Sequence, residues 1–178
     1  MTTTPEHAFL GEEFLTWLWY RSESGQATFT TDQGGAVAVA FDDLLVFGGE
    51  DENRMQQTLR RGLPTLSLEA KAALQAGKRL RKARLVLADG PEQWSFTLDG
   101  ATLAFGSVRC PDPDGDDDEA APTPAELDCA RMDGFARLAR RLDGVYRLFL
   151  DERLSDDWER ASVPSLRRWI DEKRGERV

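Results

Sequence analysis

The chain has 178 residues, a length that suits one domain or one domain with an appended helical piece. Its hydrophobic fraction of 40% and charged fraction of 31% are those of a globular protein rather than a disordered one. The formal net charge of −9 at pH 7 excludes a uniformly basic nucleic-acid binder and a polybasic membrane-surface protein.

The N-terminal part predicts a disordered polar segment at residues 1–8 and an α+β domain at residues 9–110. Four apolar side chains recur at helical spacing near its start: Leu10, Phe14, Trp17 and Leu18. The sequence therefore predicts a helix at Phe9–Tyr20, which Gly25 ends. Because other apolar residues fall on its remaining faces, we expect this helix to be buried on more than one side or to dock a partner.

Residues 26–49 read as β-strands. Apolar and β-branched residues fill three runs, ATFTTD, GAVAVAF and LLVFGG. Tight turns are predicted between the runs, at Gly34-Gly35 and at Asp42-Asp43, because these residue pairs suit hairpin turns. A further strand is predicted within Arg54–Arg61.

The middle of the chain predicts a helix and then a meander. The helix is expected at Leu66–Ala76, with Ser67 or Thr65 as its N-cap and Gly77 as its end. Three strands are predicted to follow: Arg79–Ala88, Trp94–Leu98 and Thr102–Val108. An Asp-Gly pair lies in each gap between them, which is a strong hairpin signal.

The C-terminal part is predicted to be helical. Residues 111–122 carry six acidic groups and three prolines, which is typical of a solvated linker. At 123–178 we expect helices that pack on the domain or on a partner. A long helix is predicted at Ala125–Leu150, and a short final one has Pro164 in its first turn. The predicted fold class is α+β, with an antiparallel sheet, an N-terminal helix, one mid-chain helix and a long C-terminal helix after an acidic linker.

The sequence offers little for catalysis. His7 is the single histidine, and no phosphate-binding loop, dinucleotide motif, nucleophile elbow or zinc spacing is present. The acidic linker lacks EF-hand spacing, because Gly115 comes fourth from Asp112 instead of sixth. We therefore expect no enzyme, no cofactor and no metal site.

Redox state and location follow from similar arguments. Two cysteines, Cys110 and Cys129, do not make a disulfide framework, so reduced thiols are favoured. Residues 1–8 have no basic start and no apolar core, so they are not a secretory signal. Apolar stretches such as Phe14–Tyr20 are far shorter than the ~20 residues of a membrane span. A cytoplasmic protein without membrane partners is expected.

Five cations gather within seven residues at the start of a predicted strand: Lys78, Arg79, Arg81, Lys82 and Arg84. Strand alternation places Lys82 and Arg84 on one face and Arg81 on the other. Such a cluster suits contact with the phosphates of DNA. The alternative is an edge strand that charge protects from unwanted pairing. Both interpretations stand at this point.

A second candidate surface lies on the long C-terminal helix. Its apolar residues step by three and four and form one continuous seam: Phe135, Leu138, Leu142, Val145 and Phe149. The seam is predicted to pack on a protein partner or on a second copy of the chain. A protein-interaction module with an acidic surface is therefore the alternative to direct DNA binding.

Several segments resemble the C-terminal half of RdgC-type recombination-associated proteins. The similarity begins at FLTWLWYRSESG (Phe14–Gly25), continues through LSLEAKAALQAGKRLRKARLVL (Leu66–Leu87) and includes WSFTLDGATLAF (Trp94–Phe105). Ala76, Gly77 and Lys78 stand where a helix of that family ends and runs into a strand. The likeness covers about residues 8–150 and lies in order and spacing rather than in one diagnostic motif.

The resemblance implies an α+β fold and a cytoplasmic, nucleoid-associated role. RdgC-type proteins bind DNA without strong sequence preference, form ring-shaped dimers around it and restrain RecA-type recombinases. Homodimerisation and a recombinase or other protein partner are therefore expected. Two departures from the family are the absent N-terminal half and the acidic charge. The resemblance assigns no individual DNA-contacting residue. The basic strand start at 78–84 falls in a region where this chain and the family both have cations.

Overall fold

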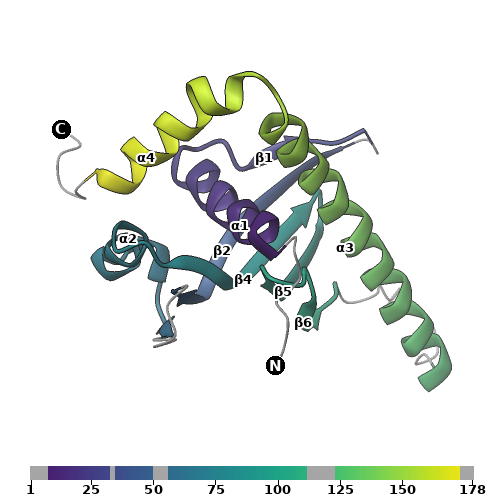
Figure 1. The fold of residues 1–178 in the computed structure, drawn as a ribbon. Coiled ribbons are helices and arrows are strands. Elements are labelled where there is room, and N and C mark those ends of the chain that lie inside the picture. Colours follow the sequence, from purple (N-terminus) through teal and green to yellow (C-terminus); the bar gives the residue numbers. More distant parts are fainter. Residues whose placement is uncertain (1–7, 33–34, 50–55, 112–122, 173–178) are drawn as a thin grey trace.

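The computed structural model describes residues 8–32, 35–49, 56–111 and 123–172, with side chains from residue 10 onward. It confirms the predicted α+β class, because an antiparallel sheet is packed by helices on one of its faces (Figure 1). The helices are α1 (Ala8–Glu23), α2 (Leu68–Gln75), α3 (Pro124–Arg153) and α4 (Val163–Asp171), with a 3-10 turn at Pro64–Leu66 and a π-helical turn at Trp158–Ser162. The strands are β1 (Thr28–Thr30), β2 (Ala36–Gly48), β3 (Gln57–Arg60), β4 (Arg79–Asp89), β5 (Glu92–Asp99) and β6 (Phe105–Arg109).

All pairs in the six-stranded sheet are antiparallel. Its order is β1-β2-β4-β5-β6, and β3 pairs with the second half of β2 on the side where β1 pairs with the first half. The predicted meander is confirmed: β4 and β5 pair in register from Lys82↔Asp99 to Asp89↔Glu92, and β6 follows as an edge strand. Gly90, at the tight turn, has φ +60°, which a glycine adopts without strain.

The turn predicted at Asp42-Asp43 is wrong. β2 continues through this pair, and the register with β4 shifts between Phe41 and Leu45. Asp42, Asp43 and Leu44 therefore form a bulge opposite Arg84. Because the bulge adds an even number of residues, Phe41 and Leu45 still face the same side of the sheet.

The core lies between the sheet and the helices. α1 crosses β2 and β4, and α3 and α4 flank it (Figure 1). The surrounding elements explain why α1 is apolar nearly all round: Trp17 packs against Phe149 of α3, whereas Trp19 packs against Phe47 of β2 and Trp169 of α4. α1 also approaches the turn after β5 closely, since a Cβ placed on Gly11 would overlap the backbone oxygen of Gly100.

Capping signals mark the helix boundaries, and those of α2 and α4 were predicted. Ser67 accepts a hydrogen bond from the backbone N–H of Ala70 at 3.1 Å and so caps α2, as one of the two predicted caps. α2 is followed by Gly77 at φ +78°, as the sequence predicted. α3 begins with a capping box between Thr123 and Glu126. α4 has Pro164 in its first turn.

Two expected segments lie outside the described residues. These are most of the disordered N-terminus and all but the first residue of the acidic linker, at 112–122. In the part of the chain that is described, no helix is long and apolar enough to cross a bilayer.

Candidate functional site

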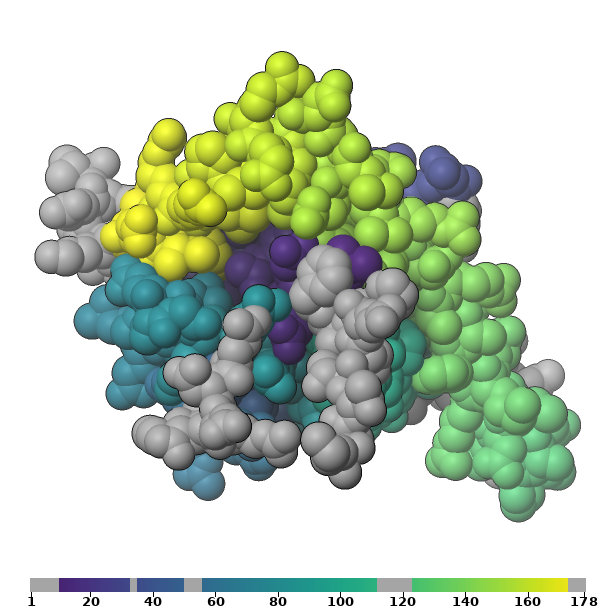
Figure 2. Space-filling view, viewed as in Figure 1, coloured from purple at the N-terminus to yellow at the C-terminus, as the bar shows by residue number. Residues whose placement is uncertain are grey.

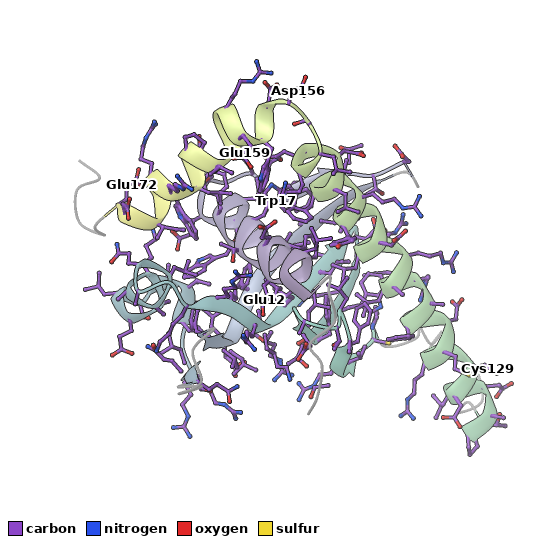
Figure 3. All side chains as sticks on the ribbon, in the orientation of Figure 1. Glu12, Trp17, Cys129, Asp156, Glu159 and Glu172 are labelled. Carbon is purple, nitrogen blue, oxygen red and sulfur yellow. The ribbon has the colours of Figure 1, made fainter. Side chains whose placement is uncertain are left out.

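The predicted basic cluster lies where α2 gives way to β4, and the strand divides it between two faces. Arg79 and Arg81 turn toward α1, where both approach the carboxylate of Glu12. A guanidinium nitrogen of Arg79 lies 3.6 Å from that carboxylate, and one of Arg81 lies 3.4 Å from it. The side chain of Glu12 is only 7% exposed, so these arginines neutralise a charge at the base of the helix layer. Figure 3 labels Glu12 on α1, above β4.

Lys82 and Arg84 point away from the helices, on the face predicted for them. Lys82 pairs with Asp99 of β5 at 3.4 Å. Arg84 lies opposite the β2 bulge, with nitrogens 3.6 Å from Asp42 and 3.9 Å from Asp43. Arg84 is therefore held between two carboxylates.

The acidic partners reduce the positive potential that the sequence suggested. Four of the five predicted cations are in ion pairs, and Lys78 donates to the neutral carboxamide of Gln57 at 3.1 Å. The pairs of Lys82 and Arg84 are partly exposed, so each contributes little and salt weakens it. A phosphate group in contact with these residues would have to compete with the aspartates.

The sheet face opposite the helices carries Lys82 and Arg84 of this cluster. Small side chains dominate its centre: Ala38, Ala40, Val86, Ala88, Ser95 and Thr97. The alanines of β2 are exposed there, because the helices pack on the other face. We call this surface the uncovered sheet face.

Two further arginines lie at the margins of the uncovered sheet face. Arg60 on β3 is the cross-strand neighbour of Leu44, and Arg109 on β6 that of Ser95. Both are exposed, and neither has an acidic partner among the described residues. Cations therefore reach this face from β3, β4 and β6. Sequence reasoning missed Arg109 as part of this surface, because only strand pairing brings β6 to it.

The predicted partner seam is mostly core. Leu138, Val145 and Phe149 are fully buried and Leu142 is 6% exposed. These residues pack within the chain, so the seam as predicted is not a docking surface. Phe135 is 42% exposed, although its ring meets Phe105 of β6 edge-on. One turn earlier, Met132 is 73% exposed.

Cys110 lies in an open groove of about 830 Å³ between the β5–β6 edge and the start of α3. Burial raises the pKa of its thiol, while Arg137 and Arg131 act in the opposite direction. Cys110 and Cys129 are both free thiols. A single thiol with a raised pKa is a poor nucleophile at neutral pH, so the groove does not suggest cysteine catalysis.

A second groove, of about 430 Å³, lies between α1, the start of β4, the π-helical turn and α4. Within the described ranges, no group of three or more histidine, cysteine or acidic residues is placed to hold a metal ion. His7 lies outside those ranges.

No protein-family model matches the chain, and no curated protein sequence matches it significantly.

Proposed function

We propose that this chain is a non-enzymatic DNA-associated protein, similar to RdgC-type proteins, which binds DNA without strong sequence specificity and modulates recombination. The uncovered sheet face is the proposed contact surface, in place of the basic strand start alone. The observation that carries the proposal is the convergence of Arg60, Arg84 and Arg109 on one open face from three strands.

The dimensions of this face suit a nucleic acid. Four strand spacings separate β3 from β6 through β2, β4 and β5, which amounts to about 19 Å. This width exceeds the roughly 12 Å of a major groove, so marginal cations can reach phosphates on both of its sides. The small residues between them allow the DNA backbone to approach the sheet, and no base-reading group is required.

The electrostatics predict weak binding that depends strongly on salt. Lys82 and Arg84 must exchange their aspartate partners for phosphates, whereas Arg60 and Arg109 have no such partner among the described residues. Each phosphate neutralised releases counterions, so affinity falls steeply as salt increases. This surface fits transient contacts with any DNA sequence.

Fluorescence anisotropy with labelled duplex DNA tests the proposal, at about 50 mM and about 200 mM salt. The double variant Arg60→Glu/Arg109→Glu should weaken binding and lower the slope of affinity against salt by about two units on logarithmic axes. The matched control is Arg131→Glu/Arg147→Glu, which makes the same charge change on exposed parts of α3. Equal effects of the two variants, or no binding by the unaltered chain at low salt, would overturn the proposal.

A protein-interaction module is the second candidate function. The acidic partners of the basic strand start favour it, since they leave little positive charge there for phosphate. The exposed apolar residues Met132 and Phe135 supply a contact surface on α3, and a second copy of the chain is the partner we propose. Sedimentation equilibrium of Phe135→Glu, with Leu154→Glu as the exposed control, tests it. A monomer at all concentrations in the unaltered chain would exclude this dimer.

A further inference from the structure

The groove of about 430 Å³ has an apolar wall and a charged rim. Its apolar wall comes from three elements: Leu74 of α2, Trp158 of the π-helical turn, and Val163, Leu166 and Ile170 of α4. The space-filling view shows the purple atoms of α1 set back beside the contact between the yellow α4 and the teal α2 (Figure 2). A hollow of this size with an apolar lining is typical of sites for small organic molecules.

Most charges on the rim are already neutralised. Glu12 is matched by Arg79 and Arg81, and Arg153 donates to Glu13 at 2.9 Å. Two rim cations have no acidic partner among the described residues: Lys78, which bonds to the amide of Gln57, and Arg167 on α4.

The acidic side chain of Glu159 makes the charge along the rim uneven. It lies on the π-helical turn, at the other end of the C-terminal segment from Ile170, and has no ion pair with any described residue (Figure 3). It disfavours an anion at that end. The excess positive charge belongs to Lys78 and Arg167.

We propose that this groove binds a small amphipathic carboxylate, with its apolar body on Trp158, Leu166 and Ile170 and its head group paired with Arg167 and Lys78. A neutral apolar molecule would leave these cations without a counter-charge. A longer peptide would need more surface than a hollow of this size provides. The site is independent of the uncovered sheet face, so it stands whether or not the chain binds DNA.

Octanoate is the probe for this site, followed by two-dimensional NMR of the 15N-labelled full chain. We expect saturable shifts at the amides of Leu74, Val163 and Leu166, with 1-octanol binding more weakly because it has no charge. Arg167→Ala should weaken octanoate binding about fivefold, the contribution of one partly exposed ion pair, and leave octanol binding unchanged. Arg168→Ala, which removes the neighbouring exposed arginine outside the groove, should leave both unchanged.

The outcomes separate the possibilities. Saturable shifts confined to the groove support the proposal if Arg167→Ala weakens octanoate binding about fivefold and Arg168→Ala leaves it unchanged. No saturable shifts with octanoate, equal effects of the two variants, or equal affinity for octanoate and octanol would overturn it.

Discussion

Glu23 and Glu152 tie helices together that are far apart in the sequence. Glu23 accepts the indole N–H of Trp19 at 3.0 Å and that of Trp169 at 2.9 Å, which joins α1 to α4. Glu152 accepts the indole N–H of Trp17 at 3.0 Å and joins α3 to α1. A buried indole needs an acceptor, so these carboxylates fix how the tryptophans pack.

Lys71 adds a buried positive charge beside Glu23. The two side chains are 9% and 13% exposed and lie 3.4 Å apart. Glu23→Gln keeps the length of the side chain but leaves the Lys71 ammonium without its counter-charge. We expect the free energy of unfolding to fall by about 3 kcal/mol in a urea titration, because removal of one partner of a buried pair is costly.

The double variant Glu23→Gln/Lys71→Met provides the control for this prediction. It removes both charges and should recover the part of the lost stability that comes from the unpaired Lys71 ammonium, whereas the loss of one indole acceptor at residue 23 remains. If Lys71→Met destabilises Glu23→Gln further, the ion pair is not what the carboxylate provides.

The two thiols are expected to differ in reactivity. Burial raises the pKa of Cys110, so less of it is thiolate at pH 8, whereas Cys129 is exposed on α3. Iodoacetamide should therefore alkylate Cys129 several times faster than Cys110, as followed by peptide mass spectrometry. Alkylation in urea should make the two rates similar. Equal rates in the folded protein would contradict this prediction.

At the scale of elements, local signals were enough for most of the helices and strands. The cap at Ser67, the end at Gly77 and the Asp-Gly turns act through neighbouring residues, and the structure has all of them. The turn prediction at Asp42-Asp43 was wrong because the same dipeptide suits either a turn or a bulge. The choice depends on Arg84 of β4, which lies opposite the bulge and pairs with both carboxylates.

The start of α3 should respond to acid. The hydroxyl and backbone N–H of Thr123 both donate to Glu126, and these hydrogen bonds lower the pKa of Glu126. A lowered pKa in the folded state means that the ionised form stabilises the capping box. That stabilisation is present above the pKa that Glu126 has in the unfolded chain. It is lost as the pH falls through the lower pKa that Glu126 has in the folded chain. We expect the first turn of α3 to fray as the pH falls below the ordinary pKa range of a glutamate side chain.

Amide hydrogen exchange at residues 126–130 measures this fraying. Glu126→Gln should exchange faster than the unaltered chain at neutral pH and should lose the acid-dependent increase. An identical pH dependence in the variant would show that another group is responsible.

At the scale of the whole molecule, the sequence did not predict which acidic residues neutralise the basic strand start. The five cations were visible as a run, but the acidic partners of four of them come from α1, the β2 bulge and the end of β5. Glu12 gave a faint signal, as a carboxylate within an apolar helix. The uncovered sheet face also needed the tertiary structure, because strand order decides which exposed side chains share a surface.

The C-terminal helices belong to the same core as the sheet. Phe149 of α3 contacts Phe14 and Trp17 of α1, and Trp169 of α4 contacts Trp19. Leu138 and Val145 are fully buried as well. The predicted division into a domain at 9–110 and helices at 123–178 therefore separates two halves of one hydrophobic core.

A chain that ends at Pro111 tests this interdependence. Without α3 and α4 it would expose Phe14, Trp17 and Trp19, each no more than 1% exposed in the structure. Loss of several large buried contacts, at 2–5 kcal/mol for each truncated side chain in typical cores, is about the whole stability of a small domain. We expect no cooperative thermal unfolding by circular dichroism. A chain that ends at Glu172 is the control and should unfold like the full chain, whereas a cooperative transition in the shorter chain would show that residues 9–110 hold a core of their own.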